Sequence, residues 1–364
     1  EAVDGLGGEA QVAEDRDVDL DEFLDGGCDV SAALELDGVR SALFEETAGV
    51  ARGLPGVKFV AEVGPGVREP RVRLLREEPM KSAPIVWDKA GLARLTEAWR
   101  RKGLRVGFAP TMGALHRGHA ELVSRAAAEN DRVVVSVFVN PLQFGPNEDY
   151  GRYPRALPED RRLVAEAGAD LVYAPSAKAM YPKGFRTHVE VEGLSDLYCG
   201  KYRPGHFRGV ATVTLKLFNQ VRPDRAYFGE KDFQQLGILK KMVSDLDMPV
   251  KIVPVPTIRD NDGLALSSRN AYLTAAQRAS APSLRAALDV GRAAGRRRGA
   301  TPRKVTAAVR RALAGTALRL QYAAVVDAVT LEPAPHLRGR RRLLAAAHMG
   351  KTRLIDNLLL EKRP

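Results

Sequence analysis

The sequence contains very little cysteine. Only Cys28 and Cys199 occur, far apart and without CxxC spacing. Disulfide scaffolds and zinc sites need several cysteines at short spacings, so the sequence argues against both. A reducing compartment fits this cysteine usage, and we expect a cytoplasmic protein.

Long apolar runs are also missing. No stretch of ~18 apolar residues exists, so we expect no membrane span and no membrane partner. The first residues lack the basic flank and the compact apolar region of a secretory signal. Because the first residue is Glu1 and not Met, we expect the numbering to begin inside a longer reading frame.

Aromatic residues make up only 6% of the chain, although its net charge is +11. The basic excess collects at residues 296–298 and 338–342, without interleaved aromatics or a recognisable nucleic-acid-binding module. Platforms on which bases could stack are therefore few. A solvated surface that attracts a small polyanionic substrate explains the charge, and we expect no nucleic-acid partner.

The first 79 residues differ from the rest of the chain. They are rich in Gly and Asp and show weak periodicity. A helix is expected near Ser41–Val50, and extended pieces near Lys58–Val63 and Val72–Leu75. We interpret residues 1–79 as an acidic extension of unknown role, partly disordered, or as an artefact of the assigned start.

Regular alternation of strands and helices begins near Ile85 and predicts one domain over residues 80–257. Strands are expected over 104–109, 132–139, 171–174, 225–228 and 250–254, and helices over 89–102, 119–129, 158–167, 209–221 and 233–245. Near-continuous Val, Ile and Leu in strands that alternate with helices predict an α/β fold with a parallel sheet covered on both faces.

The pattern changes after Pro254 and Pro256. Helical stretches are expected over 274–292 and 301–313, and strands over 320–326 and 342–347. Residues 258–364 are therefore predicted to form a smaller α+β domain.

The strongest chemical signal lies where the first long strand meets a helix. The strand runs into Pro110–Gly113, and His116 and His119 then open the helix. A helix N-terminus offers unpaired N–H groups and a positive dipole end, which suit phosphate. Two histidines three residues apart can reach the same phosphate, and Gly118 between them allows close approach. The pattern predicts nucleotidyl transfer, with these groups stabilising charge on the phosphates.

Two further loops predict contacts to phosphate. Phe228–Asp232 again joins a strand to a helix, where such folds bind ligands, and places Lys231 as a point charge. Asp262–Asn270 combines two serines with Arg269 after a glycine, which is typical of a mobile polyphosphate clamp.

Polar turns supply candidate substrate contacts. Gln143 follows the buried strand ending near Val139, and Gln235 lies one helical turn after Lys231. Tyr153–Arg155 and Arg203–Phe207 could add further contacts, although Arg203 and His206 could equally serve only to shape a loop.

Taken together and in order, these stretches resemble the pantoate–β-alanine ligase family over roughly residues 80–360. The matching segments are PTMGALHxGH, FVNPxQF, YPR, MYP, RPGHFxGV, RPDxxxFGEKDxQQ, GLALSSRN and AAHxGxTRLIDN. The resemblance implies a Rossmann-like nucleotidyltransferase domain with a smaller α+β C-terminal lid domain, usually as a homodimer. It also implies condensation of (R)-pantoate with β-alanine through a pantoyl-adenylate, with ATP giving AMP and pyrophosphate, and a need for Mg²⁺.

The resemblance carries roles onto individual residues. His119 would be the proton donor, and His116, Lys231 and Arg269 would stabilise the transferring phosphate. The residues implied to bind ATP are Pro110, Thr111, Met112, Gly113, Ala114, Leu115, His116, Arg117, Gly118, His119, Gly229, Glu230, Lys231, Asp232, Ile258, Leu266, Ser267, Ser268 and Arg269. Gln143 and Gln235 would hold pantoate, with Gln143 also near β-alanine, and Asp160 would help to position Mg²⁺. Leu266 stands where the family often has Met, a change expected to be benign because the contact is through the backbone.

Three other functional hypotheses remain open at this point. The first is another HxGH nucleotidyltransferase that passes AMP to a phosphate acceptor, which the paired glutamines and the RPGHF stretch argue against. The second is a binding or regulatory protein that kept the fold and lost turnover. The third is a nucleic-acid binder, which would show steep salt dependence.

Overall fold

The structure is a computed structural model that describes residues 57–62, 71–76, 82–146 and 148–363. The chain divides into two compact units, Glu1–Met80 and Lys81–Pro364. In the first, β1 (Val57–Glu62) pairs antiparallel with β2 (Arg71–Arg76), close to the two extended pieces expected there. The helix expected near Ser41–Val50 lies outside the described residues. No helix in the described ranges is long and apolar enough to cross a membrane.

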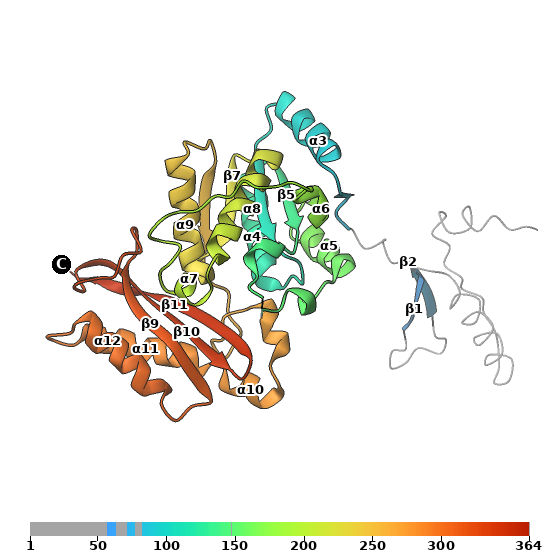
Figure 1. Ribbon diagram of the computed structural model, residues 1–364. Helices are drawn as coiled ribbons and strands as arrows, with labels where there is room; N and C mark the ends of the chain where they lie inside the picture. The colour runs from blue at the N-terminus through green and yellow to red at the C-terminus, as the bar shows by residue number, and fades with distance from the viewer. Residues whose placement is uncertain (1–56, 63–70, 77–81, 147, 364) are drawn as a thin grey trace, which may run out of the picture. The chain divides into compact units, whose positions relative to one another are not determined.

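The second unit is built on a six-stranded parallel sheet (Figure 1) with strand order β3-β6-β5-β4-β7-β8. Every neighbouring pair in it is parallel. The strands are β3 (Ile85–Val86), β4 (Val106–Thr111), β5 (Arg132–Val137), β6 (Leu171–Tyr173), β7 (Arg225–Gly229) and β8 (Lys251–Val255). The predicted α/β class is thereby confirmed.

Helices cover both faces of this sheet, because alternate strand residues enter two separate cores. Phe108 of β4 faces a core shared with three helices, α3 (Lys89–Arg101), α8 (His206–Val221) and α9 (Phe233–Asp245). Ala109 faces the other core, with α4 (Arg117–Glu129) and α5 (Leu157–Glu166). The strands therefore read as continuous apolar runs in the sequence.

Short helical turns follow several strand ends and complete the unit. They are η1 (Pro141–Gln143), η2 (Tyr150–Arg152), α6 (Ala177–Met180), α7 (Cys199–Tyr202), η3 (Glu230–Asp232) and η4 (Ser268–Tyr272). Because all six strands run the same way, η1, η3 and the start of α4 lie at the same edge of the sheet.

The C-terminal part is a smaller α+β unit, as expected, drawn orange to red in Figure 1. Its antiparallel sheet has the order β11-β10-β9. The strands are β9 (Leu318–Asp327), β10 (Gly339–Met349) and β11 (Thr352–Arg363). One face packs on α11 (Ser283–Arg296) and α12 (Pro302–Leu313), and the other contributes to the larger core of the parallel-sheet domain.

One local prediction in this part was wrong, and one strand was missed. The single helical stretch expected over 274–292 is two helices, α10 (Ala275–Ser280) and α11, because Pro282 has no N–H to continue the first. Strand β11 was not predicted at all.

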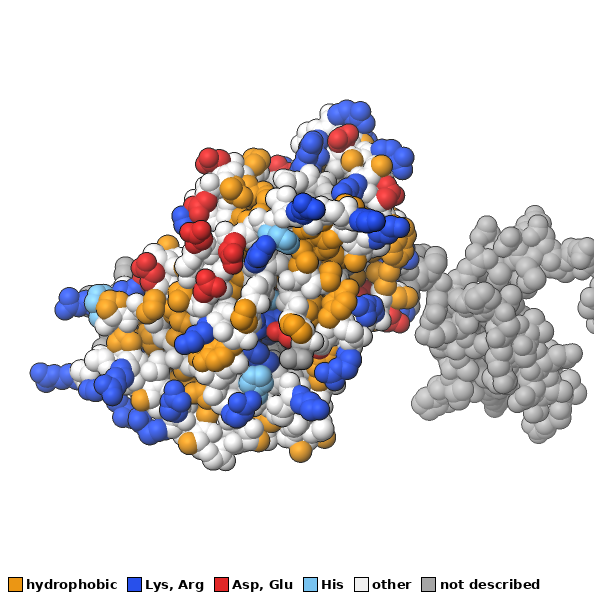
Figure 2. All heavy atoms as spheres, in the orientation of Figure 1, with side chains coloured by type: hydrophobic (Ala, Val, Ile, Leu, Met, Phe, Trp, Pro, Cys, Tyr) orange, Lys and Arg blue, Asp and Glu red, His pale blue; other side chains and the backbone are white. Residues whose placement is uncertain are grey.

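Basic side chains do not form one continuous area on the face shown in Figure 2. Lys and Arg are scattered there among apolar, acidic and uncharged groups.

Candidate active site

The turn between β4 and α4 reverses the chain with two residues in the left-handed region. Gly113 has φ 89° and Ala114 has φ 50°. A side chain at Gly113 would lie 3.1 Å from both a carboxylate oxygen of Asp160 and Val137, so glycine suits the position on two counts. The turn delivers His116 to the N-cap of α4.

His116 and His119 cap the helix with their Nδ1 atoms. Nδ1 of His116 accepts the Gly118 N–H (3.1 Å), and Nδ1 of His119 accepts the His116 N–H (3.3 Å). The two rings lie 4.1 Å apart between centroids. An imidazole that accepts at Nδ1 carries its proton on Nε2, so each ring has an Nε2–H to donate.

The surroundings keep both rings neutral. Burial, followed by the charge of Lys231, lowers the pKa of His116 to about 4. Burial lowers the pKa of His119 to about 3, with smaller contributions from His116 and Lys231. Near pH 7 the site therefore holds two neutral N–H donors beside a lysine cation.

Asp160, expected near Mg²⁺, holds the same turn. Its carboxylate oxygens accept the N–H groups of Ala114 (3.0 Å) and Leu115 (2.6 Å). Burial raises the pKa of Asp160, while these two hydrogen bonds act in the opposite direction. Its contacts explain the geometry of the turn, and a part in placing a metal stays a prediction.

The β7–η3 turn presents Lys231. Gly229, at the end of β7, has no atom within 4 Å of where a side chain would begin, which leaves open space for a ligand. The Lys231 Nζ lies 3.6 Å from Asp232. Asn357 of β11 donates to the carbonyls of Glu230 and Lys231, both at 2.9 Å.

The loop from Ile258 to Arg269 contacts the histidine turn. The Leu266 N–H donates to the Ile258 carbonyl (3.0 Å), and the Ser268 hydroxyl donates to the Ala114 carbonyl (2.9 Å). A side chain at Gly118 would lie 3.7 Å from Leu266. The two motifs, far apart in the sequence, are therefore neighbours in the fold.

Arg269 already has an anionic partner. Its Nε and Nη2 each lie 2.9 Å from a carboxylate oxygen of Asp149. The guanidinium also lies over the rings of Tyr153 and Phe144, 5.6 and 5.9 Å from their centroids. A triphosphate that is to bind Arg269 must therefore compete with Asp149.

Each polar group of Gln143 has a hydrogen-bond partner. Its Oε1 accepts from Asn140 (3.0 Å), and its Nε2 lies 3.0 Å from the sulfur of Met112. Its main-chain carbonyl accepts from His206 (2.8 Å) and Arg203 (3.3 Å). Arg203 and His206 thus support the Gln143 turn, which agrees with the loop-shaping role left open for them from the sequence.

Gln235 lines a small cavity of about 40 Å³ together with Lys231, Asp232, Arg203 and His206. Gln234, its neighbour, holds the α7 region, accepting from the Cys199 N–H (2.9 Å). The two predicted pantoate residues are therefore linked through Arg203 and His206, which contact one and share a cavity with the other.

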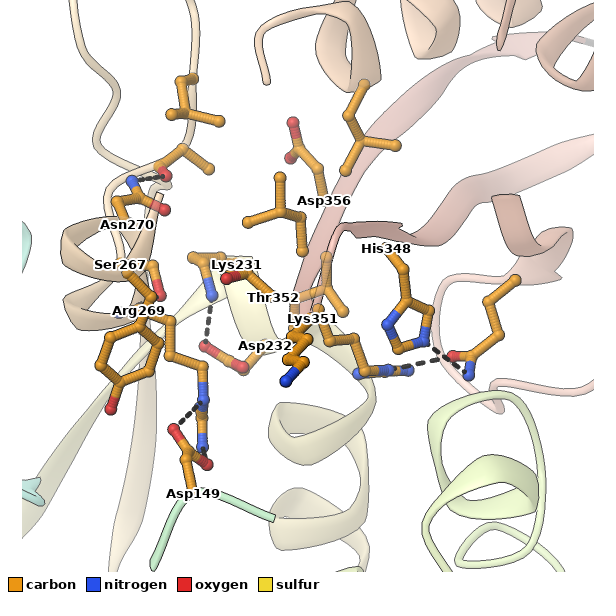
Figure 3. Close-up of a pocket in the computed structure, with 18 of the residues that line it drawn as sticks. Asp149, Lys231, Asp232, Ser267, Arg269, Asn270, His348, Lys351, Thr352 and Asp356 are labelled. Carbon is orange, nitrogen blue, oxygen red and sulfur yellow. Dashed lines mark hydrogen bonds and ion pairs between the residues drawn. The ribbon is translucent and has the colours of Figure 1, made fainter. Parts of the chain in front are cut away.

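A cavity of about 590 Å³ opens between the loops that carry Lys231 and Arg269 (the nucleotide loops) and the C-terminal sheet. Figure 3 shows Lys231 and Asp232 between the Arg269 segment and the β10–β11 hairpin. Residues lining it include Lys231, Asp232, Ser267, Arg269, Lys351 and Asp356. Met112, Gly113 and Asp160 instead line a separate cavity of about 400 Å³.

Three residues that contact the candidate site were not predicted from the sequence. Asn140 contacts Gln143, Asp149 contacts Arg269, and Asn357 contacts the Lys231 loop. The signal that could have found Asn140 is its position in the same polar turn as Gln143. Asp149 has no such signal, because its partner lies 120 residues away.

Comparisons with known proteins identify the family of the chain. The family described as Pantoate-beta-alanine ligase matches residues 85–359. A pantothenate synthetase of Moorella thermoacetica is 52% identical over 275 residues, covering 75% of this chain and 96% of that protein.

Solved structures are similar as well. The pantothenate synthetase of Thermus thermophilus superposes with a TM-score of 0.71 at 50% identity, covering 76% of this chain and 98% of that one. The pantoate-beta-alanine ligase of Francisella tularensis, solved with beta-gamma ATP and beta-alanine, gives 0.64 at 35% identity, covering 78% and 99%. The chain therefore belongs to the pantoate-beta-alanine ligase family and is a ligase that forms pantothenate in an ATP-dependent reaction.

Proposed function

We propose that this chain joins (R)-pantoate to β-alanine in two steps at the site described above. The observation that carries the proposal is the pair of neutral histidines at the start of α4, beside Lys231. Two Nε2–H donors and one ammonium at a helix N-terminus suit a polyphosphate whose charge grows during reaction.

In the first step a carboxylate oxygen of pantoate attacks the α-phosphorus of ATP. The bond from that phosphorus to the bridging oxygen breaks, and pyrophosphate leaves with the electron pair. His116 and His119 donate hydrogen bonds to the phosphates, and Lys231 neutralises the developing charge. We assign the β- and γ-phosphates to Ser267, Ser268 and Arg269, with Arg269 exchanging Asp149 for phosphate.

Adenine and ribose are assigned to the remaining loops. Gly229 leaves open space beside Lys231, and the Ile258 backbone lies next to Leu266. These contacts would fix the sugar and base while the α-phosphate faces the histidines.

Pantoate is assigned to Gln143 and Gln235. The bonds from Asn140, Arg203 and His206 leave Gln143 little freedom, so pantoate would meet a turn already in place. Such preorganisation brings the carboxylate close to the α-phosphorus without a covalent enzyme intermediate.

In the second step the amine nitrogen of β-alanine, as the free base, attacks the carbonyl carbon of the pantoyl-adenylate. The bond from carbon to the AMP oxygen breaks, the proton lost by the nitrogen passes to the departing AMP phosphate or to solvent, and AMP leaves. The contribution of the protein is positioning and the exclusion of water that would hydrolyse the adenylate.

We propose that Mg²⁺ enters with the triphosphate. Mg²⁺ in such sites is bound by phosphate and water oxygens and by one or two carboxylates. Among the described residues no group of three or more His, Cys, Asp or Glu could hold a metal ion, whereas Asp232 lies beside Lys231 in the cavity of about 590 Å³. When bound, the ion would neutralise phosphate charge, and Asp160 would act on it only through the turn that it holds.

Four broader expectations are proposed with the reaction. The protein would be a cytoplasmic homodimer, and its two domains would divide near residue 257, with the C-terminal domain acting as a lid. The cavity between the nucleotide loops and β10–β11 supports the last of these, since closure there would exclude water.

Supplying ATP and pantoate without an amine tests the proposal. Formation of enzyme-bound pantoyl-adenylate and pyrophosphate, followed by AMP release on adding β-alanine, is the expected result. A stable product in which AMP is joined to a phosphate acceptor would refute it, as would AMP release that ignores β-alanine.

A further inference from the structure

Strand β11 places two buried polar residues next to each other. Asp356 and Asn357 are each only 4% exposed. Successive strand residues point to opposite faces of a sheet, so the two side chains diverge. They reach two different nucleotide loops.

Asn357 reaches the loop that carries Lys231. Its Nδ2 donates to the carbonyl of Glu230 and to that of Lys231, at 2.9 Å each. A carbonyl and the N–H that follows it point in opposite directions across a trans peptide. Fixing the Glu230 carbonyl on Asn357 therefore turns the Lys231 N–H away from the C-terminal sheet.

Arg342 fixes the orientation of the Asn357 amide. It lies on the neighbouring strand, diagonal to Asn357, because Leu344 is directly opposite. Its Nε donates to the Asn357 Oδ1 (2.6 Å), which leaves the amide nitrogen to face the loop. Its Nη2 donates to Glu230 (2.8 Å), and its guanidinium lies 4.0 Å from the Phe233 ring centroid.

Asp356 reaches the loop that leads to Ser267 and Arg269. It binds the guanidinium of Arg259 through two hydrogen bonds of 2.7 and 2.8 Å. Arg259 also donates to the Gly263 carbonyl (3.0 Å), inside the same loop. One strand of the C-terminal domain thus connects to both phosphate loops.

We propose that Asn357, oriented by Arg342, is a positioning residue for Lys231 during adenylate formation. The inference rests on the proposed function and assigns the C-terminal sheet a part in the first chemical step. Two donated hydrogen bonds on consecutive carbonyls restrict the backbone of Glu230 and Lys231, and with it the reach of the lysine. A buried carbonyl that lost its donor would rotate to find another partner, because an unsatisfied group is unfavourable in the interior.

Asn357→Asp is the variant that tests this. It keeps the size of the side chain and an oxygen for Arg342, but it replaces both N–H donors by a carboxylate oxygen facing two carbonyls. The rate of pantoate-dependent exchange of pyrophosphate into ATP is expected to fall at least about tenfold, since misplacing a catalytic group by ~1 Å has effects of that order. The kcat/KM for ATP should fall as well, whereas kcat/KM for β-alanine should change by no more than about twofold, because the amine attacks after pyrophosphate has left.

Leu358→Ala is the matched control. Leu358 lies next to Asn357 on the face packed against α11 and α12, so its truncation destabilises the same strand without touching the loop. Thermal melting of both variants separates stability from rate. Exchange in Asn357→Asp equal to that of the control at equal loss of melting temperature would overturn the inference.

A second variant keeps the proposal testable if Asn357→Asp does not fold. Asn357→Ser retains one short donor, and we expect the same pattern of a lower exchange rate with a nearly unchanged kcat/KM for β-alanine. Exchange is measured first in the wild-type protein. Its absence there would refute the proposed function, whereas normal exchange in both Asn357 variants would refute only the role of Asn357.

Discussion

Gly209 lies where helix α8 packs against the turn that carries Gln143, and we predict that Gly209→Ala damages activity more than stability. A methyl group on Gly209 would lie 2.7 Å from the Gln143 nitrogen and closer still to the Leu142 carbonyl. These are backbone atoms, so the clash cannot be relieved by a change of side-chain rotamer.

The size of the effect follows from that geometry. Ordinary contact begins at 3.4 Å, so the helix and the turn must separate by about 0.7 Å at the nitrogen, and by more at the carbonyl. Overpacking of this kind destabilises by about 1–3 kcal/mol. A displacement approaching 1 Å in a group that positions substrate lowers the rate by up to about 100-fold. We therefore expect kcat/KM for pantoate to fall by roughly 10- to 100-fold.

A steady-state assay of AMP release at varied pantoate concentration measures kcat/KM, and a melting curve for each variant measures the loss of stability. Gly237→Ala is the control, because its methyl group would overlap the Leu331 side chain and no atom of the Gln143 turn. It should lose stability and keep its KM for pantoate. A Gly209→Ala protein with wild-type kcat/KM would show that the position of Gln143 does not limit pantoate activation.

Further variants test the rest of the site. Lys231→Ala should lower adenylate formation by orders of magnitude with the melting temperature nearly unchanged, and a near-normal rate would remove its assigned role. Asp149→Asn should lower the Kd for ATP in calorimetry, by up to about tenfold, because a charged hydrogen-bond partner of Arg269 is lost; a higher Kd would contradict the competition. The free energy of unfolding should fall as the pH drops from about 6.5 toward 4, because His116 and His119 have folded pKa values near 4 and 3 and unfolded ones near 6.5, so the unfolded chain binds more protons there. The fall should be shallower in His119→Asn, and an equal slope would show that this ring is not held neutral.

The parallel-sheet domain could be predicted well from sequence because its signals are local. Buried strands read as apolar runs, and helices such as α9 have the bounds that their periodicity indicates. The start of α4 was placed at His119 but lies at Arg117, because an imidazole is an unusual N-cap and its capping bonds are invisible in the sequence. The candidate phosphate residues lie in short contiguous motifs, at the ends of β4 and β7 and in the loop that leads to η4, so local sequence is enough to point to these loops.

The parts that could not be predicted depend on contacts between distant segments. Asp149 and Arg269 are 120 residues apart, and Asn357 and Lys231 are 126 apart, so neither pairing has a spacing to be read. Strand β11 escaped notice because it mixes charged and apolar residues on both faces, as a strand between two packed layers can. Which of these distant residues contact one another is determined only when the chain folds.

The hydrogen bonds from Asn357 to the Lys231 loop also couple any movement of the C-terminal sheet to the position of Lys231. If that sheet swings outward to admit substrates, the tether draws the lysine along with it. The movement that opens the cavity to substrates would then also move the Lys231 ammonium away from the phosphates. If the C-terminal domain acts as the proposed lid, the enzyme would hold ATP without splitting it while the lid is open, and would become competent only when pantoate and nucleotide are enclosed together.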